Sequence, residues 1–149
     1  VGLVFFEDTA TTEIYTLSLH GAIPILETGK SIALPRFSAK KNLYEARAIA
    51  DLGDLMPGKF GSPEPSPGSQ KMDTKQLDLA IVGGVAFDGL GGRLGRGGGF
   101  FDRLLADIPA KICGVCFDQQ VHPDVPLERH DVKMDMIATP SGWLIPPPA

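Results

Sequence analysis

Cysteine is scarce in this chain, with 2 in 149 residues. Two cysteines cannot build a disulfide framework, so we expect a reducing compartment and a cytoplasmic location. No apolar run approaches the roughly 20 residues of a membrane span, and the N-terminus lacks the basic start and apolar centre of a secretory signal. Basic residues are in the minority, with 14 against 18 acidic ones and a net charge of −4. This balance argues against nucleic acid or an anionic membrane as the main partner.

Internal repeats of about 20–50 residues are also absent, which excludes solenoids and propellers. The remaining composition is that of an ordinary globular protein, 43% hydrophobic and 21% charged. A chain of this length can bury its own core but is short for two domains of usual size. We therefore expect one compact, monomeric domain.

Short apolar segments alternate with helical or turn-rich ones. Leu77–Val82 is the best candidate for a central strand, and residues 100–108 have the spacing of an amphipathic helix. Residues 43–50 fit either a strand or a helix, whereas the prolines and glycines of 57–68 predict a loop. Further strands are predicted at 31–34 (ended by Pro35), 111–117 and 136–139. The alternation predicts a three-layer α/β fold, with a mostly parallel sheet and flanking helices.

Glycine is concentrated in one place: seven of the eleven residues from 89 to 99 are glycine. Such a loop, followed by a helix, exposes backbone N–H groups that can bind an anion. Arg93 and Arg96 add forked donors suited to phosphate, and Asp102 is the kind of hard oxygen ligand that Mg²⁺ takes beside a polyphosphate. The segment therefore indicates a nucleotide site, the alternative being a mobile, glycine-rich surface loop.

Two standard nucleotide patterns do not fit. The dinucleotide pattern G-x-G-x-x-G fails in every register, because a start at Gly95 meets Gly97 but then Phe100. The P-loop pattern fails because Pro24 stands at its first glycine. Its Lys and Ser, residues 30–31, also open a strand rather than a helix.

The segment GVAFDGLGGRLGRGGGFFDRLL resembles the signature of the 5-formyltetrahydrofolate cyclo-ligase family. Further blocks extend the resemblance over residues 26–143: GKSIALPR, DLMPGKFGSPEP, LDLAIVGGVAFD and HDVKMDMIATPSGW. It implies a Rossmann-like α/β fold of the kind shared with NagB, RpiA and CoA-transferase proteins. It also implies an ATP- and Mg²⁺-dependent cyclisation of 5-formyltetrahydrofolate to 5,10-methenyltetrahydrofolate, with release of ADP and phosphate. In that reaction the formyl oxygen is phosphorylated, N10 attacks the activated carbon, and phosphate leaves.

The resemblance also assigns roles to residues. Arg96 is the expected catalytic residue, stabilising the transferred phosphoryl group, and Asp102 and Asp131 are the expected magnesium ligands. The residues expected around ATP, of which 96–100 also face the folate, are Arg93, Leu94, Gly95, Arg96, Gly97, Gly98, Gly99, Phe100 and Phe101. Many family members carry tyrosine at Phe100 or Phe101 and some carry lysine at Gly98, so this chain has fewer polar groups there.

The N-terminal segment departs from the family. The family's first helix, with a lysine and an arginine that help bind ATP, is missing, and residues 5–25 resemble a translated sequencing adapter. We therefore expect residues 1–25 to be non-native and poorly anchored, and 26–149 to form a cyclo-ligase-like domain without that helix. Glu13 sits beside an isoleucine like the family's folate-contacting glutamate, but its spacing is wrong and it receives no role.

Two alternative functions stay open: an inactive remnant that keeps the fold and weak anion binding, and a sugar-phosphate or acyl-transfer enzyme.

Several other residues have more than one possible role in the sequence. Cys113 and Cys116 have redox or metal spacing, but on a strand they would face opposite sides, which favours buried structural cysteines. Glu64 is either a substrate-loop residue or an exposed loop acid, and His130 either orients Asp131 or is simply solvated. Asp88 caps the glycine turn without chemistry. One or both of Phe100 and Phe101 stack on the pterin, and at least one packs in the core.

Overall fold

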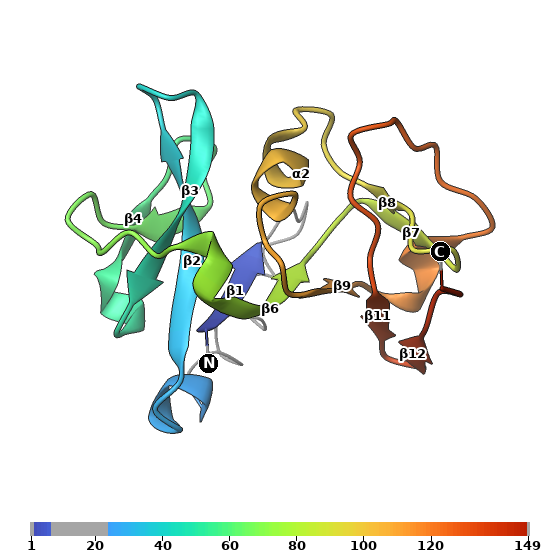
Figure 1. The fold of residues 1–149 in the computed structure, drawn as a ribbon, viewed down its shortest axis with the longest axis horizontal. Coiled ribbons are helices and arrows are strands. Elements are labelled where there is room, and N and C mark those ends of the chain that lie inside the picture. Colours follow the sequence, from blue (N-terminus) through green and yellow to red (C-terminus); the bar gives the residue numbers. More distant parts are fainter. Residues whose placement is uncertain (1, 7–23, 149) are drawn as a thin grey trace.

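The computed structural model describes residues 2–6 and 24–148, with backbone only for 2–6 (Figure 1). Its main sheet has seven strands in the order β12-β11-β9-β6-β1-β2-β3. The five central strands, from β11 to β2, run parallel, and the edge strands β12 and β3 are antiparallel to their neighbours. In chain order the strands are β1 (Gly2–Phe6), β2 (Ser31–Ser38), β3 (Leu43–Ile49), β6 (Leu77–Val82), β9 (Lys111–Val115), β11 (Met136–Thr139) and β12 (Gly142–Leu144).

The prediction of a mostly parallel sheet is confirmed, and Leu77–Val82 is a central strand as expected. The ambiguous segment 43–50 is the edge strand β3. The prediction that Pro35 ends the second strand is wrong, since β2 continues to Ser38. Among the described residues, β1 pairs with residues 31–33 of β2 and β3 is the strand that pairs at Pro35, so the missing N–H is tolerated there.

Helices are fewer than the sequence suggested. In the described part of the chain, the flanking elements are α2 (Phe100–Leu105), a helical turn at 24–27 and three single-turn 3₁₀ segments. These segments are η1 (Leu52–Asp54), η2 (Thr74–Gln76) and η3 (Asp118–Gln120). The expectation of a sheet with full helical layers is therefore corrected to a strand-rich mixed α/β fold. The crossover between β3 and β6 is rich in proline, which excludes a long helix there.

The proline-rich segment is also more ordered than a loop. β4 (Leu55–Pro57) and β5 (Pro63–Pro65) form a two-stranded antiparallel sheet, which corrects the loop predicted at 57–68. The prolines occupy alternate positions of these three-residue strands, on either side of the Met56–Glu64 pair. Short edge strands accept proline at such positions.

A third, small sheet holds the base of the glycine loop. β7 (Ala86–Asp88) pairs in parallel with β10 (Val121–His122) and antiparallel with β8 (Arg93–Leu94). The two sides of the loop therefore start from one sheet, and β10 leads into the segment that follows it.

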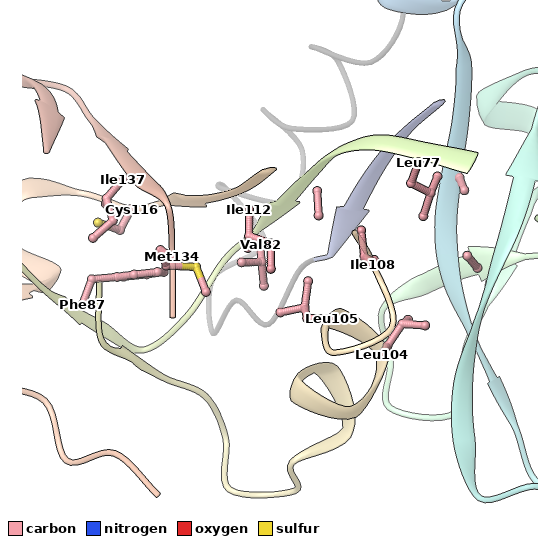
Figure 2. Close-up of a cluster of buried hydrophobic side chains, with 13 residues drawn as sticks. Leu77, Val82, Phe87, Leu104, Leu105, Ile108, Ile112, Cys116, Met134 and Ile137 are labelled. Carbon is pink, nitrogen blue, oxygen red and sulfur yellow. The ribbon is translucent and has the colours of Figure 1, made fainter. Parts of the chain in front are cut away.

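Apolar side chains cover both faces of the main sheet. Along β2, Ala33 belongs to one buried cluster and Ile32 and Leu34 belong to another, because successive residues of a strand point to opposite faces. The larger cluster lies under α2: Figure 2 shows Leu104 and Leu105 among the side chains of the neighbouring strands. Its buried members are Ala33, Ala46, Leu77, Ala80, Val82, Phe87, Leu104, Leu105, Ile108, Ile112, Cys116, Met134 and Ile137.

The N-terminal strand is part of the sheet. Gly2–Phe6 pairs with both β2 and β6, so the expectation of poor anchoring before residue 26 does not hold for these five residues. Glu13 and most of segment 5–25 lie outside the described residues. Among the residues described, no helix has the length and apolar character needed to cross a membrane.

Glu45 on β3 is a buried acid held by three cations. Its oxygens accept hydrogen bonds from Lys41 Nζ at 2.6 Å, Arg47 Nη2 at 2.9 Å and Lys71 Nζ at 3.3 Å. The bond from Lys41 contributes most to lowering the pKa of Glu45 from 4.5 to about 2, against a smaller opposing effect of burial. A carboxyl group with a lowered pKa in the folded state adds stability above its unfolded pKa, and that stability is lost as the pH falls towards 2.

We therefore expect Glu45→Gln to lower the free energy of unfolding at pH 7 by about 1–2 kcal/mol, since Lys41 and Lys71 are more than half exposed and solvent screens them. The difference from the unsubstituted protein should shrink between pH 4.5 and pH 3. Urea unfolding at pH 7, 4 and 3 measures it, with the exposed Glu27→Gln as the control. A difference that stays constant over this range would rule out the ion pairs as its cause.

Candidate active-site cleft

One cleft of about 510 Å³ collects the residues that the sequence singled out. Its walls come from the glycine loop and the start of α2, from residues 126–128 and 130–131, and from Tyr44, Phe60 and Ser62. All the predicted site residues line it: Arg93, Leu94, Gly95, Arg96, Gly97, Gly98, Gly99, Phe100, Phe101, Asp102 and Asp131. The fold thus brings Asp131 to the same cavity as a loop that lies about thirty residues earlier in the chain.

The glycine loop needs glycine at two of its turns. Gly97 has φ +92° and Gly99, which begins α2, has φ +63°, both in the left-handed region that favours glycine. Arg103, one turn into α2, donates to the carbonyl oxygens of Gly98 (Nη2, 3.4 Å) and Gly99 (Nε, 3.3 Å). A Cβ at Gly98 would lie 2.6 Å from the ring of Phe100, so the glycine allows that ring to pack against the loop.

The two arginines of the loop have different environments. The Arg93 side chain is 1% exposed; its Nε donates to the carbonyl of Gly83 at 2.8 Å, and its Nη1 lies 3.5 Å from Oδ2 of Asp102. Much of its donor capacity is therefore directed into the protein, where it positions Asp102. Arg96 is exposed and lines the cleft. Of the two, Arg96 is better placed to meet an incoming anion.

Asp102 and Asp131 lie on neighbouring segments of the cleft wall. Asp102 is buried, and its Oδ1 accepts from the backbone N–H of Val132, the residue after Asp131, at 3.1 Å. Oδ2 of Asp131 accepts from the N–H of Glu128 at 2.7 Å, and its Oδ1 lies 3.5 Å from Nε2 of His130. His130 is also 60% exposed, which fits the solvated interpretation, and its contact with Asp131 keeps the orienting role as a prediction.

This donor set fits magnesium bound together with a polyphosphate. Each carboxylate keeps lone pairs beyond the contacts above, and Mg²⁺ at such sites commonly takes one or two protein carboxylates, with phosphate and water completing its shell. Among the described residues no group of three or more His, Cys, Asp or Glu is placed to hold a metal by protein ligands alone. Two carboxylates beside a phosphate site are consistent with that arrangement.

Four aromatic rings also line the cleft. The ring of Phe37 stands edge-on to the rings of Tyr44, Phe60 and Phe100, with centroids 5.4–5.6 Å apart. The ring centroids of Tyr44 and Phe101 lie 5.0 Å apart. We call the four rings that line the cleft, those of Tyr44, Phe60, Phe100 and Phe101, the aromatic wall; Phe37 packs against three of them. Phe101 packs against the large core cluster, which confirms that at least one of the two adjacent phenylalanines belongs to the core.

Three residues with open sequence interpretations, Glu64, Cys113 and Cys116, prove to be buried. Glu64 lies in β5 and is 5% exposed, so the interpretation as an exposed acid is wrong. Burial raises the pKa of the Glu64 carboxyl group, partly offset by the hydrogen bond that its Oε2 accepts from the N–H of Phe37. Cys113 and Cys116 are buried free thiols, as predicted, and burial raises the pKa of Cys116 to about 11.

Part of the cleft was not foreseen from the sequence. Tyr44, Phe60, Ser62, Pro126, Leu127 and Glu128 line it, although the sequence had assigned them no role. Their only signal was their neighbourhood: Phe60 and Ser62 lie in the block DLMPGKFGSPEP, and Pro126 and Leu127 precede HDVKMD.

The parallel sheet and the cleft of glycine, arginine and carboxylate define an α/β protein suited to an anionic ligand. A family model for the 5-formyltetrahydrofolate cyclo-ligase family matches residues 8–140, and the chain belongs to this family. The match begins inside the segment expected to be non-native.

Curated relatives and solved structures agree. The chain is 36% identical over 96 residues to a 5-formyltetrahydrofolate cyclo-ligase of Mycolicibacterium smegmatis (62% of this chain, 50% of that protein). It is 30% identical over 139 residues to a mitochondrial one of Arabidopsis thaliana (80% and 50%). The chain thus spans about half the length of these relatives. The NMR structure of Aquifex aeolicus 5,10-methenyltetrahydrofolate synthetase superposes with a TM-score of 0.77 and 26% identity, covering 99% of this chain and 72% of that one. A Mycoplasma pneumoniae 5,10-methenyltetrahydrofolate synthetase at 15% identity (TM-score 0.59, 91% and 71%) shares the fold.

Proposed function

We propose that this chain catalyses the ATP- and Mg²⁺-dependent cyclisation of 5-formyltetrahydrofolate to 5,10-methenyltetrahydrofolate, with release of ADP and phosphate. The observation that carries the proposal is the cleft, in which the glycine loop, Arg96 and both carboxylates line one cavity with the aromatic wall. Family membership supports the same reaction.

The reaction needs charge stabilisation and close approach. A formamide carbonyl is a poor electrophile and its oxygen a poor leaving group, so phosphorylation makes attack by N10 feasible. Phosphoryl transfer depends chiefly on positioning and on groups that stabilise charge on the moving phosphoryl oxygens. We propose that Arg96 supplies the positive charge that stabilises these oxygens, and that the loop from Arg93 to Gly99 holds the ATP phosphates.

Asp102 and Asp131 are the proposed magnesium ligands. Bound there, Mg²⁺ would neutralise phosphate charge. The protein's own part is to hold both carboxylates in place: Arg93 and the N–H of Val132 fix Asp102, and the N–H of Glu128 fixes Asp131. We further propose that the protein works as a cytoplasmic monomer with folate as its small-molecule partner.

The aromatic wall is the proposed contact for the flat pterin. Phe60 is 54% exposed at the edge of the cleft, so its ring can be removed with little loss of core packing. We expect Phe60→Ala to raise KM for the folate about tenfold, since stacking on an aromatic ring is worth about 1–3 kcal/mol. KM for ATP and the melting temperature should change little.

Steady-state kinetics with each substrate varied in turn measure this effect. Phe117→Ala removes a ring of similar exposure (40%) outside the cleft lining and serves as the matched control. An unchanged folate KM in Phe60→Ala would exclude the wall as the pterin contact.

The direct test is the near-ultraviolet absorbance of methenyltetrahydrofolate, followed with the chain as written, 5-formyltetrahydrofolate and Mg²⁺, with and without ATP. An ATP-dependent rise establishes the reaction. Its absence, in folded protein that still binds ATP, would favour the inactive remnant. Turnover of a sugar phosphate or an acyl donor in place of the folate would identify the third alternative.

A further inference from the structure

We propose that Asp88 is a positioning residue that joins the two polar walls of the cleft, the glycine loop and residues 126–131. Nothing in the reaction requires Asp88 to touch a substrate, and it is not among the residues that line the cleft. Its effect on turnover rests on the proposed function, whereas its effect on the cleft walls does not.

Asp88 bonds to both walls through one carboxylate. Its Oδ1 accepts from the backbone N–H groups of Leu90 at 2.9 Å and Gly92 at 2.8 Å, which lie just before Arg93 in the glycine loop. Its Oδ2 accepts from the N–H of Val125 at 3.0 Å, which lies just before Pro126. One side chain therefore fixes the start of both segments, 37 residues apart in sequence for the Val125 bond.

The site of Asp88 suits a carboxylate and no other side chain. The residue is 2% exposed, so water cannot replace a lost partner. All three of its side-chain partners are donors, and an ionised carboxylate is acceptor-only. An asparagine of the same shape can accept on one side only, and its NH₂ group would then face an N–H on the other.

The local backbone is built around this carboxylate. A Cβ on Gly92 would collide with Oδ2 of Asp88, so glycine at 92 allows the loop to approach it. The loop is tied to the far segment a second time, by the N–H of Met134 donating to the carbonyl of Gly91 at 2.8 Å. Loss of the Val125 bond would therefore free the segment at its start, between residues 123 and 131, while its end stays attached.

The consequence reaches the proposed magnesium ligands. The segment that begins at Val125 continues through Glu128, whose N–H holds Asp131, to Val132, whose N–H holds Asp102. A shift of this segment moves both carboxylates relative to Arg96 on the loop. A misplacement of about 1 Å in a reacting assembly can lower the rate by about 100-fold.

The test is Asp88→Asn, with Gly92→Ala as an independent way to displace the same carboxylate. The matched control is Asp135→Asn, whose Oδ2 also accepts a backbone N–H from a distant residue, Ile112 at 2.8 Å, but lies outside the cleft lining. Backbone amide exchange by NMR and steady-state kinetics are measured on the full chain. Thermal unfolding identifies variants that stay folded.

In both Asp88→Asn and Gly92→Ala we expect exchange at the Val125, Glu128 and Val132 amides to accelerate at least about tenfold, with the β6 amides unchanged. Turnover with the folate should fall by about 10–100-fold, with KM for ATP and the Mg²⁺ requirement rising more than KM for the folate. Asp135→Asn should change neither the exchange at these amides nor the KM values.

Two results would overturn the proposal. One is unchanged exchange at Glu128 and Val132 in folded Asp88→Asn. The other is faster exchange there with all kinetic constants as in the unsubstituted protein, which would leave Asp88 a purely structural role. If the unsubstituted chain shows no turnover, the proposed function fails by itself, and the exchange at Glu128 and Val132 still decides whether Asp88 holds the cleft walls.

Discussion

Arg96→Ala should abolish most ATP-dependent turnover while leaving the protein folded. Arg96 is exposed and lines the cleft, so its loss removes charge from the site without opening the core. Groups that stabilise charge in a transition state are typically worth about 10²–10³-fold in rate, and we expect a loss of at least this size. Methenyltetrahydrofolate absorbance gives the rate, and circular dichroism with thermal unfolding confirms the fold.

Two further variants make the result specific. Arg96→Lys keeps the positive charge but loses the planar fork, so it should recover only part of the rate if two phosphoryl oxygens are bound at once. Arg129→Ala removes a neighbouring exposed arginine that does not line the cleft and should retain full activity. Wild-type turnover in Arg96→Ala would remove this residue from the mechanism.

Asp102→Asn should lower both stability and activity. The carboxylate of Asp102 lies beside the guanidinium of Arg93, whose side chain is 1% exposed, and the substitution removes the negative charge from this buried pair. Removing one partner of a buried ion pair costs about 3–5 kcal/mol, and the retained amide oxygen places the expected loss at about 3 kcal/mol. Urea unfolding measures it. The exposed Asp107→Asn, just beyond α2, should be neutral.

Asp131→Asn tests the proposed magnesium role without the structural role that Asp102 also has. The side chain of Asp131 is more exposed than that of Asp102, at 18% against 12%, and in the described part of the chain its carboxylate contacts His130 and the N–H of Glu128 rather than a buried arginine. We therefore expect stability close to that of the unsubstituted protein but a rise of at least about 10–100-fold in the Mg²⁺ concentration for half-maximal turnover. If instead both asparagine variants kept the normal Mg²⁺ dependence, neither carboxylate would be a ligand.

The sequence predicted those parts of the fold that local pattern controls. The run LDLAIV is apolar at every position except Asp78 and lies at the centre of the sheet, as a largely buried parallel strand should. The errors at Pro35 and at 57–68 arose because the cost of a proline depends on whether a neighbouring strand needs its N–H. That information belongs to the pairing of strands and is not present in the residue itself.

The site was predictable to the extent that it is contiguous. Residues 93–102 share one motif, and Asp131 joined them only through resemblance, since no spacing rule links residues about thirty positions apart. Burial could not be foreseen: the side chain of Arg93 is 1% exposed and bonds Gly83 and Asp102 inside the protein. Tyr44 lies on β3 and Phe60 lies between β4 and β5. Only the tertiary structure shows that these segments reach the cleft.

The topology of the sheet also has a consequence for the order of assembly. β2 and β3 are joined by the four residues 39–42 and pair in seven consecutive positions, so closing this hairpin costs little chain entropy. The parallel pairs β6–β9 and β9–β11 link residues more than twenty apart, and such pairings form more slowly. Phe37 and Tyr44 stand on the early hairpin, whereas Arg96, Asp102 and Asp131 depend on the late strands. On a growing polypeptide, the hairpin that carries Tyr44 would therefore form first, and the rest of the cleft would be completed only as the last strands are added.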